Sequence, residues 1–121
     1  QLMRGVRSLT EAGYWPILAH AERYLCLREH GLEKISSLGC YLQMNFESLQ
    51  GHWYQRGVRW CRKQVEEGRI QFLGTDLHRT DFRPPVITEA VKWLIHHINP
   101  EALEEMVHRN PVCIIKNEKI Q

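Results

Sequence analysis

The segment IQFLGTDLHRTDFRPP, from Ile70 to Pro85, joins a short apolar run to a loop rich in ionisable side chains. Its first five residues predict a buried strand, and Asp76 and His78 follow at the carboxyl end of that strand. Residues i and i+2 of an extended segment project to the same face, so these two side chains could reach one centre. The pattern D-x-H is common by itself, and the structural alternative is a turn capped by Asp76 with His78 at the surface.

Two further strands are expected upstream, and each leads to a polar residue. YWPILA (residues 14–19) precedes His20, and CYLQMN (residues 40–45) ends in Asn45. A helical pattern over residues 1–12 precedes the first strand, and helical patterns over residues 22–37 and 55–67 separate the three strands. Strands that alternate with helices predict an α/β fold with parallel strands, arranged as a sheet or as part of a barrel.

The last third of the chain is expected to begin with an amphipathic helix. Its apolar side is formed by Ile87, Val91, Leu94, Ile95 and Ile98. Asn99-Pro100 then restarts a short helix, since proline is favoured in a first helical turn. Asn110-Pro111 leads to VCIIKN, which we expect to be a last strand or an extended tail.

The composition is that of a globular domain without strong charge. The chain has 121 residues, of which 43% are hydrophobic and 25% charged, and this length suits one domain. A net charge of +2 is too small to argue for a nucleic-acid partner. The cluster Arg59, Arg62 and Lys63, followed by Glu66 and Glu67, is typical of a solvated helix face with i,i+4 ion pairs.

We also expect a cytoplasmic protein that does not insert into a membrane. No apolar run approaches the roughly 18 residues of a membrane span. Buried free thiols are the expected state of the cysteines, and a disulfide or zinc framework is the alternative. The four cysteines are Cys26, Cys40, Cys61 and Cys113.

Chemistry is expected at the carboxyl ends of the strands, because ligand sites of parallel α/β folds lie there. His20, Asp76 and His78 fall at such ends, and imidazole with carboxylate suits zinc, manganese or iron. Arg23 and Arg83 lie nearby in sequence, and guanidinium groups match phosphate oxygens. The structural alternatives are a hydrogen bond from His20 to the backbone at the strand end, a position in a first helical turn for Arg23, and an ordinary surface charge at Arg83.

Four stretches of the chain carry a family resemblance: PILAHAERY, GCYLQMNFESLQGHWYQRG, GTDLHRTDFRPP and NPVCIIKNE. They resemble motifs of the PHP (polymerase and histidinol phosphatase) family, in its branch of bacterial manganese-dependent protein-tyrosine phosphatases. PILAHAERY resembles P-I-L-A-H-P-E-R-Y, and GTDLHRTDFRPP matches S-D-x-H-x-x-x-x-R-P-P without a gap. GCYLQMNFESLQGHWYQRG is similar to G-x-x-L-Q-x-N-x-x-S-L-x-G-x-Y-G, and NPVCIIKNE to N-P-x-x-I-L-x-N-E. The four matches occur in order and cover nearly the whole chain.

The resemblance implies a distorted (β/α)7 barrel with a multinuclear metal site. His20, Asp76 and His78 would be metal ligands, and Arg23 and Arg83 would contact the substrate phosphate. The implied metal is Mn²⁺, with Fe, Zn or Co as alternatives. The implied reaction is hydrolysis of phosphotyrosine on a protein, a bacterial tyrosine kinase being the expected substrate, in the control of capsule and exopolysaccharide synthesis.

Two departures from the family pattern limit this expectation. The usual proline after the histidine is Ala21, and the family's N-terminal H-x-H has no counterpart. We therefore expect residues 1–121 to be the C-terminal portion of a single PHP barrel without its N-terminal metal-binding half. Such a chain is expected to bind metal weakly, to be inactive or weakly active, and to associate as a homo-oligomer or with the missing half. The alternatives are a PHP phosphatase of a small phosphomonoester such as histidinol phosphate, and a non-catalytic interaction module.

Overall fold

A parallel three-stranded sheet organises the computed structural model, which describes residues 2–23, 31–74 and 87–116. The strands are β1 (Ile17–Leu18), β2 (Tyr41–Asn45) and β3 (Phe72–Gly74), in the order β1-β2-β3. Leu18 pairs with Leu42, and Asn45 pairs with Gly74. The predicted α/β fold with parallel strands is confirmed.

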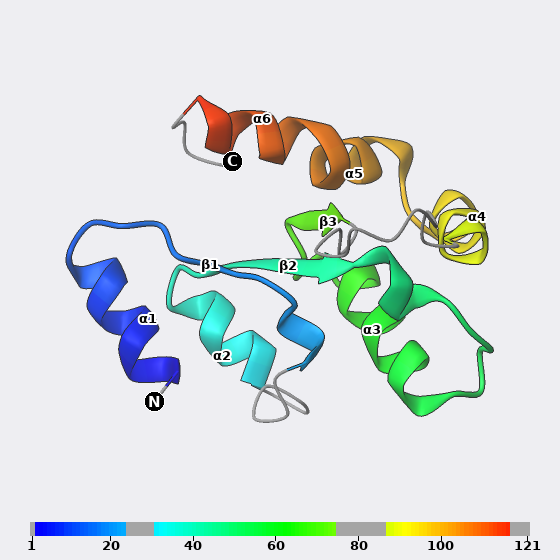
Figure 1. The fold of residues 1–121 in the computed structure, drawn as a ribbon, viewed down its shortest axis with the longest axis horizontal. Coiled ribbons are helices and arrows are strands. Elements are labelled where there is room, and N and C mark those ends of the chain that lie inside the picture. Colours follow the sequence, from blue (N-terminus) through cyan, green and yellow to red (C-terminus); the bar gives the residue numbers. More distant parts are fainter. Residues whose placement is uncertain (1, 24–30, 75–86, 117–121) are drawn as a thin grey trace, which may run out of the picture.

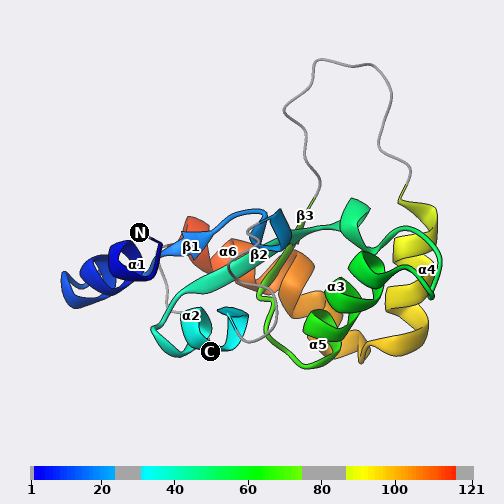
Figure 2. The same ribbon diagram turned by 90° about the horizontal axis from the view of Figure 1, so that it is seen from below.

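Helices lie on both sides of this sheet. α1 (Leu2–Glu11), α2 (Gly31–Ser37) and α3 (Arg56–Glu66) are seen below the strands in Figure 1, and α5 (Pro100–Glu104) and α6 (Asn110–Ile115) above them. Figure 2, turned by 90°, places the same two groups in front of and behind the sheet. The remaining elements are the 3-10 turns η1 (Ala21–Arg23) and η3 (Phe46–Leu49), the helix α4 (Thr88–His97) and the π turn η4 (Glu105–Arg109).

The core is centred on β2, because helices cover both faces of that strand. Leu42 and Met44 of β2 are fully buried, together with Leu32 and Ile35 of α2 and Leu94 of α4. Burying a side chain of this size contributes about 1.5–3 kcal/mol. A central strand covered on both faces accounts for the apolar residues at successive positions in CYLQMN.

The strands are shorter than the sequence predicts, and Pro16 explains the first of them. Proline has no backbone N–H for a ladder, so pairing begins at Ile17. The carbonyl of Pro16 still accepts a hydrogen bond from the Tyr41 backbone N–H at 2.9 Å. Of the helix expected over residues 22–37, the described parts are η1 and α2.

The expected strand or tail after Asn110 is wrong, since residues 110–115 form α6. The Asn110 side-chain amide donates to the Gln71 carbonyl at 2.8 Å, which holds the start of α6 against β3. Pro111 lies in the first turn of α6, where proline is tolerated. The π turn η4 immediately precedes α6. Pro111 has no N–H to donate to the carbonyl four residues earlier, which lies in η4, so the regular α-helical hydrogen bonding is interrupted there.

The prediction that Ile95 belongs to the buried apolar face of α4 is also wrong. Leu94 is buried, whereas Ile95 is 62% exposed. The side of α4 that packs on the core is narrower than the pattern suggested, because α4 contacts mainly η3 and α5.

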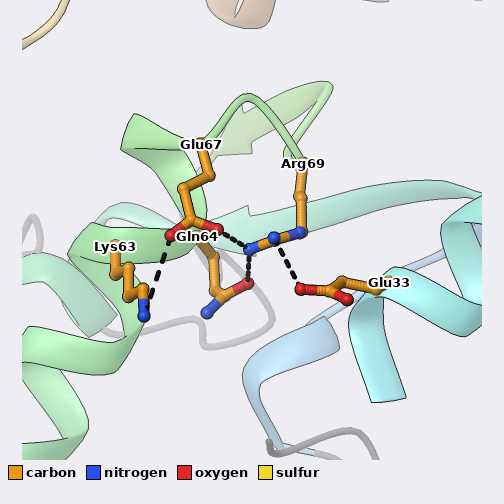
Figure 3. A network of polar contacts seen from close by, with 5 residues as sticks. All are labelled: Glu33, Lys63, Gln64, Glu67 and Arg69. Carbon is orange, nitrogen blue, oxygen red and sulfur yellow. Dashed lines mark hydrogen bonds and ion pairs between the residues drawn. The ribbon is translucent and has the colours of Figure 1, made fainter. Parts of the chain in front are cut away.

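Arg69 ties two helices together at the amino end of β3 (Figure 3). Its guanidinium donates to Glu33 Oε1 of α2 at 2.8 Å and to Gln64 Oε1 of α3 at 2.9 Å. It also forms an ion pair with Glu67, which pairs at 3.8 Å with Lys63. This polar network stabilises the fold and is not part of a ligand site, because ligand sites lie at the opposite ends of parallel strands.

The cysteines bear out the prediction of free thiols where they are described. Cys40 and Cys61 are buried, Cys113 is half-buried and none of these three forms a disulfide, whereas Cys26 lies outside the described residues. Among the described residues, no helix has the length and apolar character needed to cross a membrane.

Candidate functional site

The parallel register brings the carboxyl ends of the strands to one edge of the sheet. η1 follows β1, η3 follows β2, and the chain leaves β3 at Gly74 beside Asn45. Loops that converge at such an edge form the usual ligand site of an α/β fold.

His20 has a strained backbone at this edge. Its φ of +53° lies in the left-handed region, which costs a non-glycine residue about 1–2 kcal/mol. The His20 N–H donates to Gln43 Oε1 at 2.8 Å, and the His20 carbonyl accepts from the Arg23 N–H at 3.0 Å. Nδ1 of the ring is buried. Strain of this kind, held by surrounding contacts, is found preferentially at functional sites.

Glu22 is buried next to His20, which the sequence analysis did not anticipate. Its side chain is 6% exposed, and Oε1 accepts from Ser48 Oγ at 3.0 Å and from the Asn45 N–H at 3.5 Å. Oε2 is buried and has no hydrogen-bond partner among the described residues. A buried carboxylate oxygen is costly without a donor or a cation nearby.

Gln43, Asn45 and Ser48 complete the support of this turn. Gln43 Nε2 donates to Asn45 Oδ1 at 3.1 Å and to the Met44 carbonyl at 3.2 Å. We call Glu22, Gln43, Asn45 and Ser48 the polar clamp, since their side chains connect η1 with β2 and η3. A signal was available in the sequence: two amides at alternate positions of an otherwise apolar strand.

Arg23 ends η1 and is exposed. Ala21, which stands where the resemblance has proline, is fully buried. The small side chain therefore fits the turn between His20 and Glu22.

The structure brings two of the five predicted site residues, His20 and Arg23, to the same turn. The other three, Asp76, His78 and Arg83, lie outside the described residues. Within residues 2–23, 31–74 and 87–116, no group of three His, Cys, Asp or Glu side chains is placed to hold a metal ion.

Several known proteins are similar to this chain. A model of the family described as capsular polysaccharide synthesis, CpsB/CapC, matches residues 1–116. The tyrosine-protein phosphatase CpsB of Streptococcus agalactiae serotype V is 30% identical over 115 residues, covering 89% of this chain and 47% of that protein. The tyrosine-protein phosphatase CpsB of Streptococcus pneumoniae is 26% identical over 127 residues, covering 99% of this chain and 52% of that protein.

The fold agrees with these relatives. A crystal structure from a study of YwqE of Bacillus subtilis and CpsB of Streptococcus pneumoniae, described as unique metal-dependent tyrosine phosphatases, has a TM-score of 0.79. It is 24% identical, and the match covers 99% of this chain and 49% of the solved chain. This chain thus spans about half the length of the relatives it matches. By its sequence over residues 1–116, the chain belongs to the CpsB/CapC family of capsular polysaccharide synthesis.

Proposed function

We propose that this chain forms part of a metal-dependent protein-tyrosine phosphatase that acts in capsular or extracellular polysaccharide synthesis. The observation that carries the proposal is the strained His20 at the carboxyl edge of the sheet, held by the polar clamp beside Arg23. Membership of the CpsB/CapC family supports it, as do relatives named tyrosine-protein phosphatases.

The side chains of this edge suit a divalent metal. His20 would hold the ion together with Asp76 and His78, and imidazole with carboxylate fits Mn²⁺, with Fe, Zn or Co as alternatives. The buried Oε2 of Glu22, two residues from His20, favours a cation close to this turn. When bound, such an ion supplies Lewis acidity and stabilises negative charge on a phosphoryl group.

The arginines and the polar clamp have separate tasks in this proposal. Arg23 and Arg83 would bind phosphate oxygens through paired N–H donors, which offset the charge that develops during hydrolysis. Glu22 and Gln43 would keep His20 and Arg23 in a fixed orientation, so that little reorganisation is needed when substrate binds.

The remaining parts of the proposal concern the whole protein. Residues 1–121 would supply the C-terminal portion of a PHP barrel, with further metal ligands contributed by another segment or chain. The half-length coverage of the relatives supports this division. The substrate would be a phosphotyrosine protein in the cytoplasm, a bacterial tyrosine kinase being our candidate.

Hydrolysis assays test the proposed activity. A phosphotyrosine peptide, p-nitrophenyl phosphate and histidinol phosphate are compared with and without Mn²⁺, using this chain and any longer form of the protein that contains it. We expect Mn²⁺-dependent hydrolysis with preference for the phosphotyrosine peptide in the form that completes the site. His20→Ala and His78→Ala should each lower kcat/KM at least about 100-fold, or about 2.7 kcal/mol.

His96→Ala is the matched control, since His96 is exposed on α4. Its kcat/KM should stay within about twofold of the parent, which is under about 0.5 kcal/mol. Preference for histidinol phosphate would move the protein to another PHP branch. Unchanged activity in His78→Ala would show that His78 is not a metal ligand.

A further inference from the structure

A groove with tryptophan and arginine side chains lies beside α3, and none of the polar clamp residues lines it. Its volume is about 580 Å³, within the range of ligand pockets. Residues of α3, the preceding loop and α4 line it: Trp53, Arg56, Arg59, Trp60, Arg62, Lys63, Glu66 and Trp93. We call this feature the Trp-Arg groove.

The Trp-Arg groove concentrates positive charge. Four of its side chains are cationic and one is anionic, an excess of three charges in a chain whose net charge is +2. Arg56 and Arg59 lie in the first turn of α3, which has no acidic residue there. Cations at a helix N-terminus oppose the helix dipole, so these arginines do not serve helix stability. Together with the dipole, they attract an anion.

Arg62 differs from the other cations because it builds the floor of the groove. Its Nη2 donates to the Leu49 carbonyl at 2.9 Å and to the Gly51 carbonyl at 3.3 Å. The guanidinium also lies 5.2 Å from the centroid of the Trp93 ring of α4. Arg62 therefore connects η3, α3 and α4, in contrast to the solvated position that the sequence suggested.

Arg56, Arg59 and Lys63 face solvent above this floor. The predicted i,i+4 pairing is present for Lys63 and Glu67, at 3.8 Å. The Lys63 side chain is 69% exposed, and an ion pair so exposed contributes little. These three cations are thus accessible to a ligand.

Exposed aromatic rings accompany the cations. Trp53 is 72% exposed, and its ring meets Tyr54 edge-on at 5.9 Å. Tyr54 in turn stacks on His52 at 5.1 Å. Tryptophan, tyrosine and arginine are the residues that dominate binding energy at protein interfaces.

The groove is connected to the candidate site through η3, which packs against α3. Ser48 of the polar clamp precedes Leu49, whose carbonyl is held by Arg62, and residues 50–55 lead directly to α3. A polypeptide with one residue at the carboxyl edge of the sheet can therefore continue along α3. The 11 residues of α3 span roughly 16 Å, about five residues of extended peptide.

We propose that the Trp-Arg groove binds an acidic peptide segment containing an aromatic residue, next to the phosphotyrosine of a protein substrate. This inference rests on the proposed phosphatase function. Charge complementarity selects the ligand, since carboxylates pair with Arg56, Arg59 and Lys63, and an aromatic side chain packs on Trp53. The small net charge of the chain favours a short acidic segment over a nucleic acid.

Fluorescence anisotropy of labelled, unphosphorylated peptides tests the groove without metal or catalysis. One peptide carries tyrosine among Asp and Glu, and the other has Lys at the same positions. We expect the acidic peptide to bind at low salt and to weaken in 0.5 M NaCl. The double variant R56E/R59E should bind about tenfold or more weakly, and Trp53→Ala several-fold more weakly.

The double variant R4E/R7E on the exposed face of α1 is the control, because it makes the same charge change away from the groove. Its affinity should stay within about twofold of the parent. All substituted residues are exposed, and circular dichroism verifies that each variant is folded.

The outcomes separate this inference from the proposed function. Equal binding of the acidic and lysine peptides would contradict the proposed binding site, even if phosphatase activity is present. So would a loss of affinity in R4E/R7E as large as that in R56E/R59E. Tighter binding of a single-stranded oligonucleotide than of the acidic peptide, at the same salt, would also overturn it. If the acidic peptide binds as expected but no phosphotyrosine substrate is hydrolysed, the groove stands and the phosphatase function fails.

Discussion

His20 shows how a single residue depends on side chains distant in sequence. Its left-handed backbone is opposed by local sterics and is held by Gln43, 23 positions later. Glu22 holds the same turn from the other side through Ser48, 26 positions later. The turn is therefore pre-organised by tertiary contacts and not by its own sequence.

We predict that Glu22 stabilises the fold through Ser48. Ser48→Ala removes the hydrogen bond to the buried carboxylate and Glu22→Gln replaces the carboxylate by a weaker, neutral acceptor, so each should lower the free energy of unfolding by about 1–3 kcal/mol. In urea denaturation the double variant should show a coupling energy of about 1 kcal/mol.

Glu33→Gln is the matched control, since Glu33 also accepts a hydrogen bond but is half exposed. It should lower the free energy of unfolding by less than about 1 kcal/mol. A loss as large as that of Glu22→Gln, or additive effects at Glu22 and Ser48, would contradict the role assigned to the polar clamp.

Cys40 predicts a dependence of stability on alkaline pH. Burial raises the pKa of its thiol above the ordinary 9.0, and a hydrogen bond with the Leu18 backbone lowers it by a smaller amount. The pKa of this thiol is higher in the folded than in the unfolded protein. Its contribution to the free energy of unfolding is therefore complete below pH 9.0 and is lost as the pH rises through the pKa of the folded state.

The slope above pH 9.0 should be at most about 1.4 kcal/mol of unfolding free energy per pH unit. Cys40→Ala should remove this part of the slope, while Cys113→Ala should keep it. Thermal unfolding from pH 7 to 10.5 measures both. Identical pH profiles for the parent and Cys40→Ala would show that the thiol is not responsible.

Helix α6 illustrates what an element's own sequence can and cannot predict. At Asn99-Pro100 the expected helix start is confirmed, and the Asn99 side chain accepts from the Glu101 N–H at 2.8 Å. At Asn110 the side chain instead bonds to Gln71, 39 residues earlier. That contact becomes visible only when β3 is in place.

Asn110→Ala should therefore cost more than Asn99→Ala. The Asn110 amide is buried, and its removal leaves the Gln71 carbonyl without this donor, which should lower the free energy of unfolding by about 1–3 kcal/mol. The exposed cap at Asn99 contributes about 1 kcal/mol or less. Urea denaturation of the two variants compares them, and an equal or reversed order would mean that α6 is not held to β3 by this bond.

Across the whole molecule, the sequence predicted the order of strands and helices, because local hydrophobic periodicity determines that order. Parallel strands separated by helices could be predicted, because helical patterns stop before glycines such as Gly39 and Gly68 and apolar runs follow these glycines. The position of His20 at the carboxyl edge of the sheet could be predicted from the rule on strand ends, whereas its role as a metal ligand stays a prediction. The burial of Glu22 and the exposure of Ile95 could not, since both depend on which distant elements pack against them.

The edge of the sheet at β1 is the clearest place for association. Within the described residues β1 pairs with β2, and its outer side is not covered by a further strand. Tyr14, Trp15 and Ile17 are exposed along this edge. An uncovered strand edge flanked by large apolar side chains is prone to pair with another chain.

We therefore predict that a lysine at Ile17 weakens self-association. A charge on an edge strand opposes pairing, so Ile17→Lys should raise the dissociation constant at least about tenfold in sedimentation velocity, which is about 1.4 kcal/mol. Ile95→Lys makes the same change at an exposed position of α4, away from this edge, and should associate like the parent. If both variants weaken association equally, the effect is one of general charge. If only Ile95→Lys weakens it, the interface lies on α4, and the open edge at β1 is not where chains meet.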